Sequence, residues 1–389
     1  MLLTHFRRFL RFCNKNFKIK SKINNFTDKR KKYQIPLANI FLSMLYSSLL
    51  DYPTFLSKDH LNREPFFKKF LGCKRKIIAS DSTLFRNLSN NLCDKEIEEI
   101  NICIAKKIEN ILINPVLNKR CGIMDGSGFG HNLYEVLFIP GKIDLILKFN
   151  KISKKGTELN SANILLKDTK DNFGTGFFDL FIGDGLYYSK HIFRVCIEEL
   201  KSNLLVKTTE RLNVVKDVEF YIENNAPEVI VEKGFDEERM CEYTIKVVKE
   251  IYSDTIQYPL QVAIITEHYI KPRKGKTDME TFYVITSDLS LYPFELRYAS
   301  HLRWRIENNG FKTMNNVMSS KKKKSKDQMC CINTLWIIFI AYNLLNLFIY
   351  KNKEALKEIS GSIVVTIKYW IKSFYNMLIL EYSGEKGFI

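Results

Sequence analysis

The sequence predicts an α/β protein with a helical N-terminal part, a mixed core and a β-rich segment. Three observations predict this arrangement. Residues 33–115 carry apolar side chains at helical spacing, and residues 116–205 alternate strand-like with helix-like runs. Residues 209–285 hold strand-like runs joined by polar turns. With 46% hydrophobic residues in a chain of 389, a sizeable folded core is expected.

The first 32 residues are strongly basic. They include Arg7, Arg8, Arg11 and Lys15 and end in four consecutive cations, 29–32. Residues 1–32 are therefore interpreted as a basic arm. Contact with nucleic-acid phosphates and a solvated tail are both open interpretations. The same two interpretations apply to the basic runs 271–276 and 321–326.

Residues 33–115 read as a set of helices. Ser80 or Ser82 is expected to cap a helix that carries Leu84 and Leu88 on one face, with Arg86 exposed on the other. From sequence alone, a DNA-binding region and a plain helical bundle explain this stretch equally well.

Strands are expected at several positions along the rest of the chain. In the core they fall near 121–125, 133–139, 143–149, 178–184 and 200–208. In the β-rich segment they fall near 214–222, 243–251, 260–270 and 281–285.

Two of these strands end in an aspartate beside glycines. Asp125 follows an apolar run and precedes Gly126, and Asp184 lies between Gly183 and Gly185. Glycine lets the backbone turn sharply and leaves a neighbouring carboxylate uncovered. An ordinary turn aspartate explains each motif when it is taken singly. The repetition of the design favours a shared function.

The segment Leu302–Lys312 reads as a helix. Helical spacing places Arg303 and Glu307 on one face, one turn apart. A surface ion pair is the ordinary explanation for such a pair. Trp304 lies beside them and is expected either to pack or to stack on a nucleic-acid base.

Together these three acidic side chains suit phosphodiester chemistry. Two divalent ions about 4 Å apart can clamp the attacking and leaving oxygens of a phosphate. Mg²⁺ prefers carboxylate and water oxygens, and Mn²⁺ accepts the same ligands. We therefore expect Asp125, Asp184 and Glu307 to bind two Mg²⁺ or Mn²⁺ ions.

The three motifs, in this order, resemble those of the DDE transposases of bacterial insertion sequences, in the IS-four-like group. The likeness rests on I-x-D-G-[ST] around Asp125, G-D-x-L-Y around Asp184 and R-W-x-I-E-N-x-x-F from Arg303. It implies a ribonuclease H-like (RNase H-like) catalytic domain over 116–352. It further implies an interrupting β-rich insertion at 209–285, a helical DNA-binding region at 33–115 and a C-terminal helical segment at 353–389.

The family's signature around the glutamate also contains a tyrosine and a lysine. Here the tyrosine position holds Ser300, with Tyr298 two residues away, and the lysine position holds Met314, with Lys312 nearby. Arg303 matches the signature's arginine. The residues that the resemblance implies as DNA contacts are Arg303, Trp304, Lys312, Tyr298 and Arg86.

The resemblance implies cut-and-paste DNA transposition. The enzyme would cleave double-stranded DNA at terminal inverted repeats and join the freed ends to target DNA, as a homodimer associated with the bacterial nucleoid. The net charge of +17 agrees with a polyanionic partner. An inactive, transposase-derived DNA-binding protein is a second interpretation.

A basic membrane-anchored protein is a third interpretation. Cys330–Tyr350 has about the length of a membrane span. Its asparagines, among them Asn333 and Asn343, favour a buried core helix instead.

The nine cysteines include no C-x-x-C pair, so we expect neither zinc nor a disulfide framework. A cytoplasmic protein without a secretory signal is expected.

Overall fold

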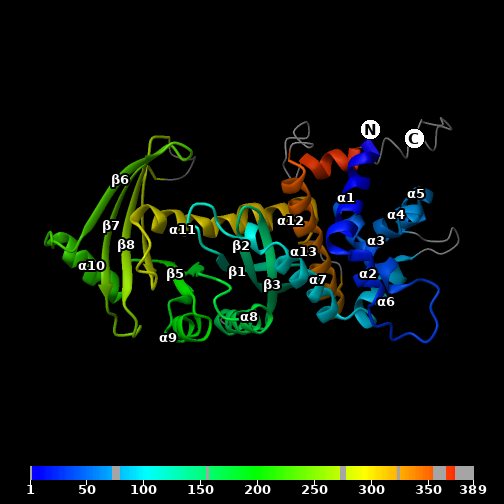
Figure 1. Ribbon diagram of the computed structural model, residues 1–389, viewed down its shortest axis with the longest axis horizontal. Helices are drawn as coiled ribbons and strands as arrows, with labels where there is room; N and C mark the ends of the chain where they lie inside the picture. Colours follow the sequence, from blue (N-terminus) through cyan, green and yellow to red (C-terminus); the bar gives the residue numbers. More distant parts are fainter. Residues whose placement is uncertain are drawn as a thin grey trace.

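A nine-stranded mixed sheet runs through the protein, with helices on both faces and a helical region at one end (Figure 1). The computed structural model describes residues 2–71, 79–154, 157–271, 277–321, 325–353 and 365–372. The expected α/β class is confirmed. Most of the basic run 271–276, the centre of the run 321–326 and most of segment 353–389 lie outside the described residues.

The sheet has the strand order β3-β2-β1-β4-β5-β9-β8-β7-β6. Strands β1 to β3 form an antiparallel meander, and β4 and β5 lie parallel to β1. The core strands are β1 (Cys121–Phe129), β2 (Asn132–Pro140), β3 (Asp144–Ile152), β4 (Leu180–Asp184) and β5 (Asn203–Thr208).

The β-rich segment continues the same sheet. Its last strand pairs antiparallel with β5, with Leu205 opposite Thr286. Its strands are β6 (Ile230–Asp236), β7 (Cys241–Ile251), β8 (Leu260–Tyr269) and β9 (Met279–Thr286). The insertion is therefore paired with the core through four residues of each strand.

One expected strand is a helix. Residues 214–222 lie in α10 (Asn213–Glu223), and the expectation of a strand there was wrong. Val214, Val215 and Val218 are buried on one side of α10, which is helical spacing. The β-branched residues favoured a strand by propensity, but packing against the insertion sheet decides the structure. Strand β6 had not been expected.

Helices cover the two faces of the core sheet unequally. On one face lie α8 (Glu158–Phe173) and the short α9 (Lys190–Arg194), with a short π-helical turn after it (Figure 1). On the other face lies α11 (Pro293–Arg305), which contacts both the core strands and the insertion strands. Because α11 spans the two parts of the sheet, it fixes the insertion relative to the core.

The helical region contains the N-terminal helices and the long helix α13 (Gln328–Lys351). In α6, Ser80 caps the first turn by accepting from the backbone of Thr83 at 3.3 Å, as one of the two expected caps. The N-terminal helices are α1 (Leu2–Phe17), α2 (Ile19–Asn24), α3 (Leu37–Leu49), α4 (Phe55–Arg63), α5 (Pro65–Leu71), α6 (Asp81–Asn90) and α7 (Asp94–Lys107).

Residues 2–24 of the expected basic arm 1–32 form the packed helices α1 and α2 rather than a solvated tail, and the cationic run 29–32 follows them outside any helix. Phe6, Phe9 and Cys13 are buried along one side of α1, and the rings of Phe9 and Phe348 lie 5.5 Å apart. Arg8 and Arg11 are exposed on the opposite side. Helical periodicity therefore separates an apolar anchor from a basic surface.

Helix α13 is the one described helix with the length and hydropathy of a membrane span, and 89% of its apolar window is buried inside the protein. Its asparagines explain this position. Asn343 accepts from the backbone N–H of Ile146 at 2.9 Å and donates to its carbonyl at 2.7 Å. Because β3 is an edge strand, these bonds satisfy backbone groups that lack a strand partner. Asn101 of α7 donates to the same carbonyl at 2.8 Å.

We predict that Asn343→Leu destabilises the protein strongly although it makes α13 more apolar. The substitution removes the acceptor of the Ile146 N–H and the donor that Asn343 Nδ2 supplies to Asn101 Oδ1 at 2.7 Å. Each buried group left unsatisfied costs about 1–3 kcal/mol. The free energy of unfolding from urea titration measures the effect. Asn316→Leu, at an exposed position, is the control and should stay within about 0.5 kcal/mol of wild type. Equal stability of the two variants would contradict the assigned role of Asn343.

Candidate active site

The two expected aspartates lie on the neighbouring parallel strands β1 and β4. Asp184 is the last residue of β4, as expected, but the expectation that β1 ends at Asp125 was wrong, because β1 continues through Gly126 to Phe129 by pairing with β2. Strand β1 pairs with β4 in the register Ile123 opposite Ile182, so Asp125 and Asp184 each lie two residues further along. Asp184 also caps the following turn, because its Oδ1 accepts from the backbone of Leu186 at 2.9 Å. The strand pairing therefore brings the two aspartates to neighbouring positions on the sheet.

The glycine before Asp184 makes room for a tyrosine. A Cβ at Gly183 would lie 2.4 Å from the ring of Tyr187, so only glycine leaves space for it. The Tyr187 hydroxyl donates to the buried carboxylate of Glu135, which lies opposite Gly126 on β2. This bond ties the turn after Asp184 to the strand beside Asp125.

Glu307 is linked to Asp125 through Arg303. One nitrogen of Arg303, Nη1, lies 3.0 Å from Glu307 Oε1 and 3.3 Å from Asp125 Oδ2. Arg303 lies in the last turn of α11, and Glu307 lies in the π-helical turn Ile306–Phe311 that follows the helix. The pair is thus more than a surface ion pair, because the arginine joins the helix to the sheet.

Burial of negative charge governs the electrostatics of this site. Burial raises the pKa of Asp125 to about 6, with Arg303 lowering it and the charges of Glu307 and Asp184 raising it. Burial also raises the pKa of Glu135 to about 8, against the hydrogen bond from Tyr187. The carboxylates therefore repel one another in the absence of further positive charge.

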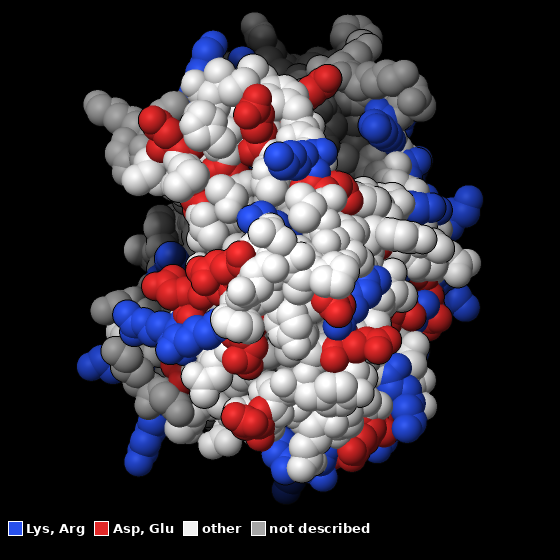
Figure 2. All heavy atoms as spheres, turned by 90° about the vertical axis from the view of Figure 1, so that its left-hand side faces the viewer, with Lys and Arg blue, Asp and Glu red and all other residues white. Residues whose placement is uncertain are grey.

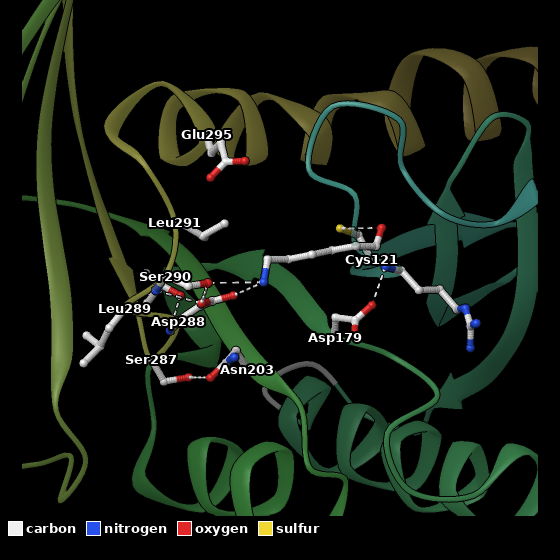
Figure 3. Close-up of polar contacts among 12 residues, drawn as sticks. Cys121, Asp179, Asn203, Ser287, Asp288, Leu289, Ser290, Leu291 and Glu295 are labelled. Carbon is white, nitrogen blue, oxygen red and sulfur yellow. Dashed lines mark hydrogen bonds and ion pairs between the residues drawn. The ribbon is translucent and has the colours of Figure 1, made fainter. Parts of the chain in front are cut away.

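The loop between β9 and α11 fixes where α11 begins (Figure 3). Lys119, just before β1, lies 2.9 Å from the buried carboxylate of Asp288. Ser287 accepts from the backbone of Leu204 at 3.1 Å, and Asp288 accepts from the Ser290 hydroxyl at 2.6 Å. These contacts anchor the return from the insertion to the start of the core strands.

The middle of α11 is anchored to the insertion by a buried ion network. Glu267 of β8 is fully buried, and its Oε1 lies 2.6 Å from Arg297 Nε and 2.7 Å from His301 Nε2. Arg297 also lies 2.9 Å from Asp236 of β6. Both anchors act on the helix that positions Arg303, so the insertion contributes to the site geometry without lying in it.

The structure brings only some of the expected DNA contacts to the carboxylates. Trp304 is half-buried, with Lys207 Nζ 4.7 Å from its ring centroid. Tyr298 packs against the core, and its hydroxyl accepts from Asn114 at 3.4 Å. Lys312 is exposed on α12 (Lys312–Val317), beyond the π-helical turn. Arg86 is exposed on α6 in the helical region.

The two departures from the family signature are buried. Ser300 is 1% exposed and donates to the carbonyl of Arg297 at 2.7 Å. Met314 is fully buried in the apolar core. Neither side chain can therefore replace the signature's tyrosine or lysine at a DNA surface.

Sequence reasoning missed Glu135 and Lys207. Lys207 of β5 lies opposite Asp184 in the parallel register, and its Nζ lies 3.8 Å from the Phe282 ring centroid. Burial lowers the pKa of Lys207. Both residues are single charges in otherwise apolar strands, which is a signal that the sequence carries.

The donor set fits a divalent cation. Oxygens of Asp125 and Glu307 already converge on one positively charged nitrogen of Arg303, and Asp184 is the register neighbour of Asp125. Within the described ranges, no three Asp, Glu, His or Cys side chains form a metal-binding group as they stand. A cation bound by both Asp125 and Glu307 would compete with the guanidinium.

No protein-family model matches this chain, and no curated protein matches it.

We predict that Asp125→Asn stabilises the metal-free protein at high pH. A folded-state pKa raised from 3.8 to about 6 means that stability is present at low pH and lost as the pH rises through 6. At 1.36 kcal/mol per pKa unit, the gain at pH 8 is at most about 3 kcal/mol.

Melting temperatures of wild type and Asp125→Asn between pH 4 and pH 8 measure this effect. The two curves should meet near pH 4, separate as the pH rises from 4 to 6, and stay apart by a nearly constant amount above pH 6. A variant that melts below wild type at pH 8 would show that the Arg303 ion pair outweighs burial and repulsion.

Proposed function

We propose that this protein is a DNA transposase that cleaves and joins DNA strands at the terminal inverted repeats of an insertion sequence. Asp125, Asp184 and Glu307 are its catalytic carboxylates. The observation that carries the proposal is their proximity: Asp125 and Asp184 are neighbours on the parallel strands β1 and β4, and Arg303 joins Asp125 to Glu307. On this proposal the protein works on nucleoid DNA as a homodimer.

The topology of the core supports an RNase H-like assignment. An antiparallel meander of three strands is followed by two strands parallel to the first, in the order β3-β2-β1-β4-β5. The motif resemblance implies this type of fold. The β-rich insertion between β5 and α11 also has the place that the resemblance gives it.

The carboxylates supply the ligands that a hard divalent ion needs. Bound there, Mg²⁺ or Mn²⁺ would activate water or a 3′-hydroxyl for attack and stabilise the leaving oxygen. Asp125 and Asp184 present their oxygens from rigid strands. Glu307 has a side chain 49% exposed, so it can approach a ligand from the solvent side.

Arg303 has two roles in the proposed site. In the free protein its guanidinium neutralises part of the charge on Asp125 and Glu307. With DNA bound, the planar guanidinium is suited to a phosphate oxygen, leaving the carboxylates to the metal ions. Lys207, beside Asp184, adds a second cation on the same part of the sheet.

The basic side of α1 is the best-supported DNA surface in the N-terminal region. Arg8, Arg11 and Lys15 are exposed there, and the opposite side of the helix is anchored in the core. By contrast, the face made by the insertion shows acidic groups interspersed with basic ones (Figure 2). A surface that follows a phosphate backbone is expected to be continuously basic.

Alanine substitutions in the three carboxylates test the proposal. Asp125→Ala, Asp184→Ala and Glu307→Ala should each abolish Mg²⁺-dependent cleavage of end DNA and leave binding within about threefold. Because such residues act as a unit, a double variant should resemble the single ones. The end DNA is identified from inverted repeats that flank the gene.

Asp171→Ala, an exposed carboxylate on α8, is the matched control and should cleave normally. A Glu307→Ala variant that cleaves like wild type would refute the assignment. Wild type that binds end DNA without cutting it would favour the second candidate, an inactive DNA-binding relative. The burial of Ser300 and Met314 at the signature positions favours that candidate.

We predict that the basic side of α1 contributes phosphate contacts. Each neutralised phosphate changes the slope of log affinity against log salt by about 0.9 for double-stranded DNA. Replacing Arg8, Arg11 and Lys15 together by glutamine should reduce the slope by up to about 2.7. Fluorescence anisotropy at several salt concentrations measures it.

Glutamine at Lys216, Lys246 and Lys249 of the insertion is the control and should leave the slope unchanged. An unchanged slope in the α1 variant would remove that helix from the DNA interface.

A further inference from the structure

We propose that Asp144 is a positioning residue for Glu307, because it holds both sides of the π-helical turn from which the glutamate projects. The inference rests on the proposed function, in which Glu307 is one of three metal-binding carboxylates. Neither sequence motif nor resemblance singles out Asp144. Asp144 is the first residue of β3, on the far side of the meander from the two aspartates.

Asp144 receives a hydrogen bond from each side of Glu307. Arg305 Nη2 lies 2.6 Å from Asp144 Oδ1, and Asn309 Nδ2 lies 2.8 Å from Oδ2. Arg305 precedes Glu307 by two residues and Asn309 follows it by two. One carboxylate therefore binds the residues on both sides of Glu307.

The turn needs such support. A π-helical turn contains an extra residue relative to an α-helix, is rare, and occurs often at functional sites. Glu307 itself is too exposed to be fixed by packing. Its direction therefore depends on its neighbours: Phe311 packs on Phe129 with centroids 5.7 Å apart, and the Tyr342 hydroxyl donates to the carbonyl of Asn309 at 3.2 Å.

Asp144 is itself rigidly held. Its residue is 8% exposed, and its backbone carbonyl accepts from Asn346 of α13 at 3.0 Å. Burial raises the pKa of this carboxyl, while Arg305 and the bond from Asn309 lower it. A buried carboxylate is costly, and the two donors offset that cost only when the turn is in place. A series of hydrogen bonds, from α13 to Asp144 and from Asp144 to the π-helical turn, therefore connects the sheet edge to the turn that carries Glu307.

The test compares Asp144→Asn with Asp168→Asn. Asparagine keeps the shape of Asp144 but loses the charge that Arg305 requires. Asp168 makes an ion pair of 2.8 Å with Lys148 on the opposite side of the sheet, so its variant removes a carboxylate contact unrelated to the turn. Three quantities are measured for each: affinity for end DNA without metal, single-turnover cleavage across a Mn²⁺ titration, and hydrogen exchange of residues 306–311.

A positioning role predicts a specific pattern for Asp144→Asn. DNA affinity should stay within twofold of wild type. The Mn²⁺ concentration for half-maximal cleavage should rise at least fivefold, and the maximal rate should fall at least tenfold. Exchange in 306–311 should quicken at least tenfold. Asp168→Asn should remain within twofold of wild type in all three measurements.

Cleavage by Asp144→Asn within twofold of wild type, at an unchanged Mn²⁺ requirement, would overturn the inference and leave the proposed function intact. If wild type does not cleave, the proposed function fails instead, and exchange in 306–311 alone decides whether Asp144 orders the turn. Should Asp144→Asn not fold, Asn309→Ala replaces it. Asn309 is exposed, and its loss should give the same pattern with smaller changes.

Discussion

The parallel pairing of β1 with β4 is the interaction on which the candidate site depends. Its register places Asp125 beside Asp184, and the adjoining parallel pairing of β4 with β5 places Lys207 opposite Asp184. Backbone hydrogen bonds thus hold like charges together that would otherwise separate. A shift of one residue in this register would turn one aspartate to the other face of the sheet. The position of α11 matters only because this pair is already in place.

The cost of assembling these charges is distributed over several contacts. Arg303 offsets part of the repulsion between Asp125 and Glu307, and Tyr187 supplies a hydrogen bond to Glu135. The helix that carries Arg303 is in turn anchored at Lys119–Asp288 and at Arg297–Glu267. A site of this kind is stable because its supports lie outside it, in residues that need not touch a substrate.

Sequence patterns predicted most of the strands and the approach of the two aspartates. The apolar run before Asp-Gly identified the end of β4 at Asp184, but β1 continues four residues past Asp125 because Gly126 to Phe129 pair with β2. Periodicity was insufficient for α10, where three valines suggested a strand although their spacing is helical. It also could not separate a basic tail from α1, because the burial of Phe6 and Phe9 depends on partners such as Phe348, distant in sequence.

Other parts of the site depend on three-dimensional proximity alone. Glu135 and Tyr187 are 52 residues apart, and Asp144 and Arg305 are 161 apart. No local pattern connects them. The π-helical turn is likewise invisible in the sequence, since Ile306 to Phe311 satisfy the spacing of an ordinary helix nearly as well. The one sequence feature that could have identified Glu135 and Lys207 is a single charged residue within an otherwise apolar strand. That feature does not identify the residues they contact.

The asparagines of α13 have a consequence for synthesis on the ribosome. Strand β3 is made early, but Asn343, which covers the backbone of Ile146, is made almost two hundred residues later. During that interval the edge of the meander is open to pairing with other chains. Helices α3, α6 and α7 also pack against α13, which is synthesised after them. The nascent chain therefore has a long aggregation-prone period, and chaperone binding to the unfinished chain is expected to affect the yield of folded protein more than it affects final stability.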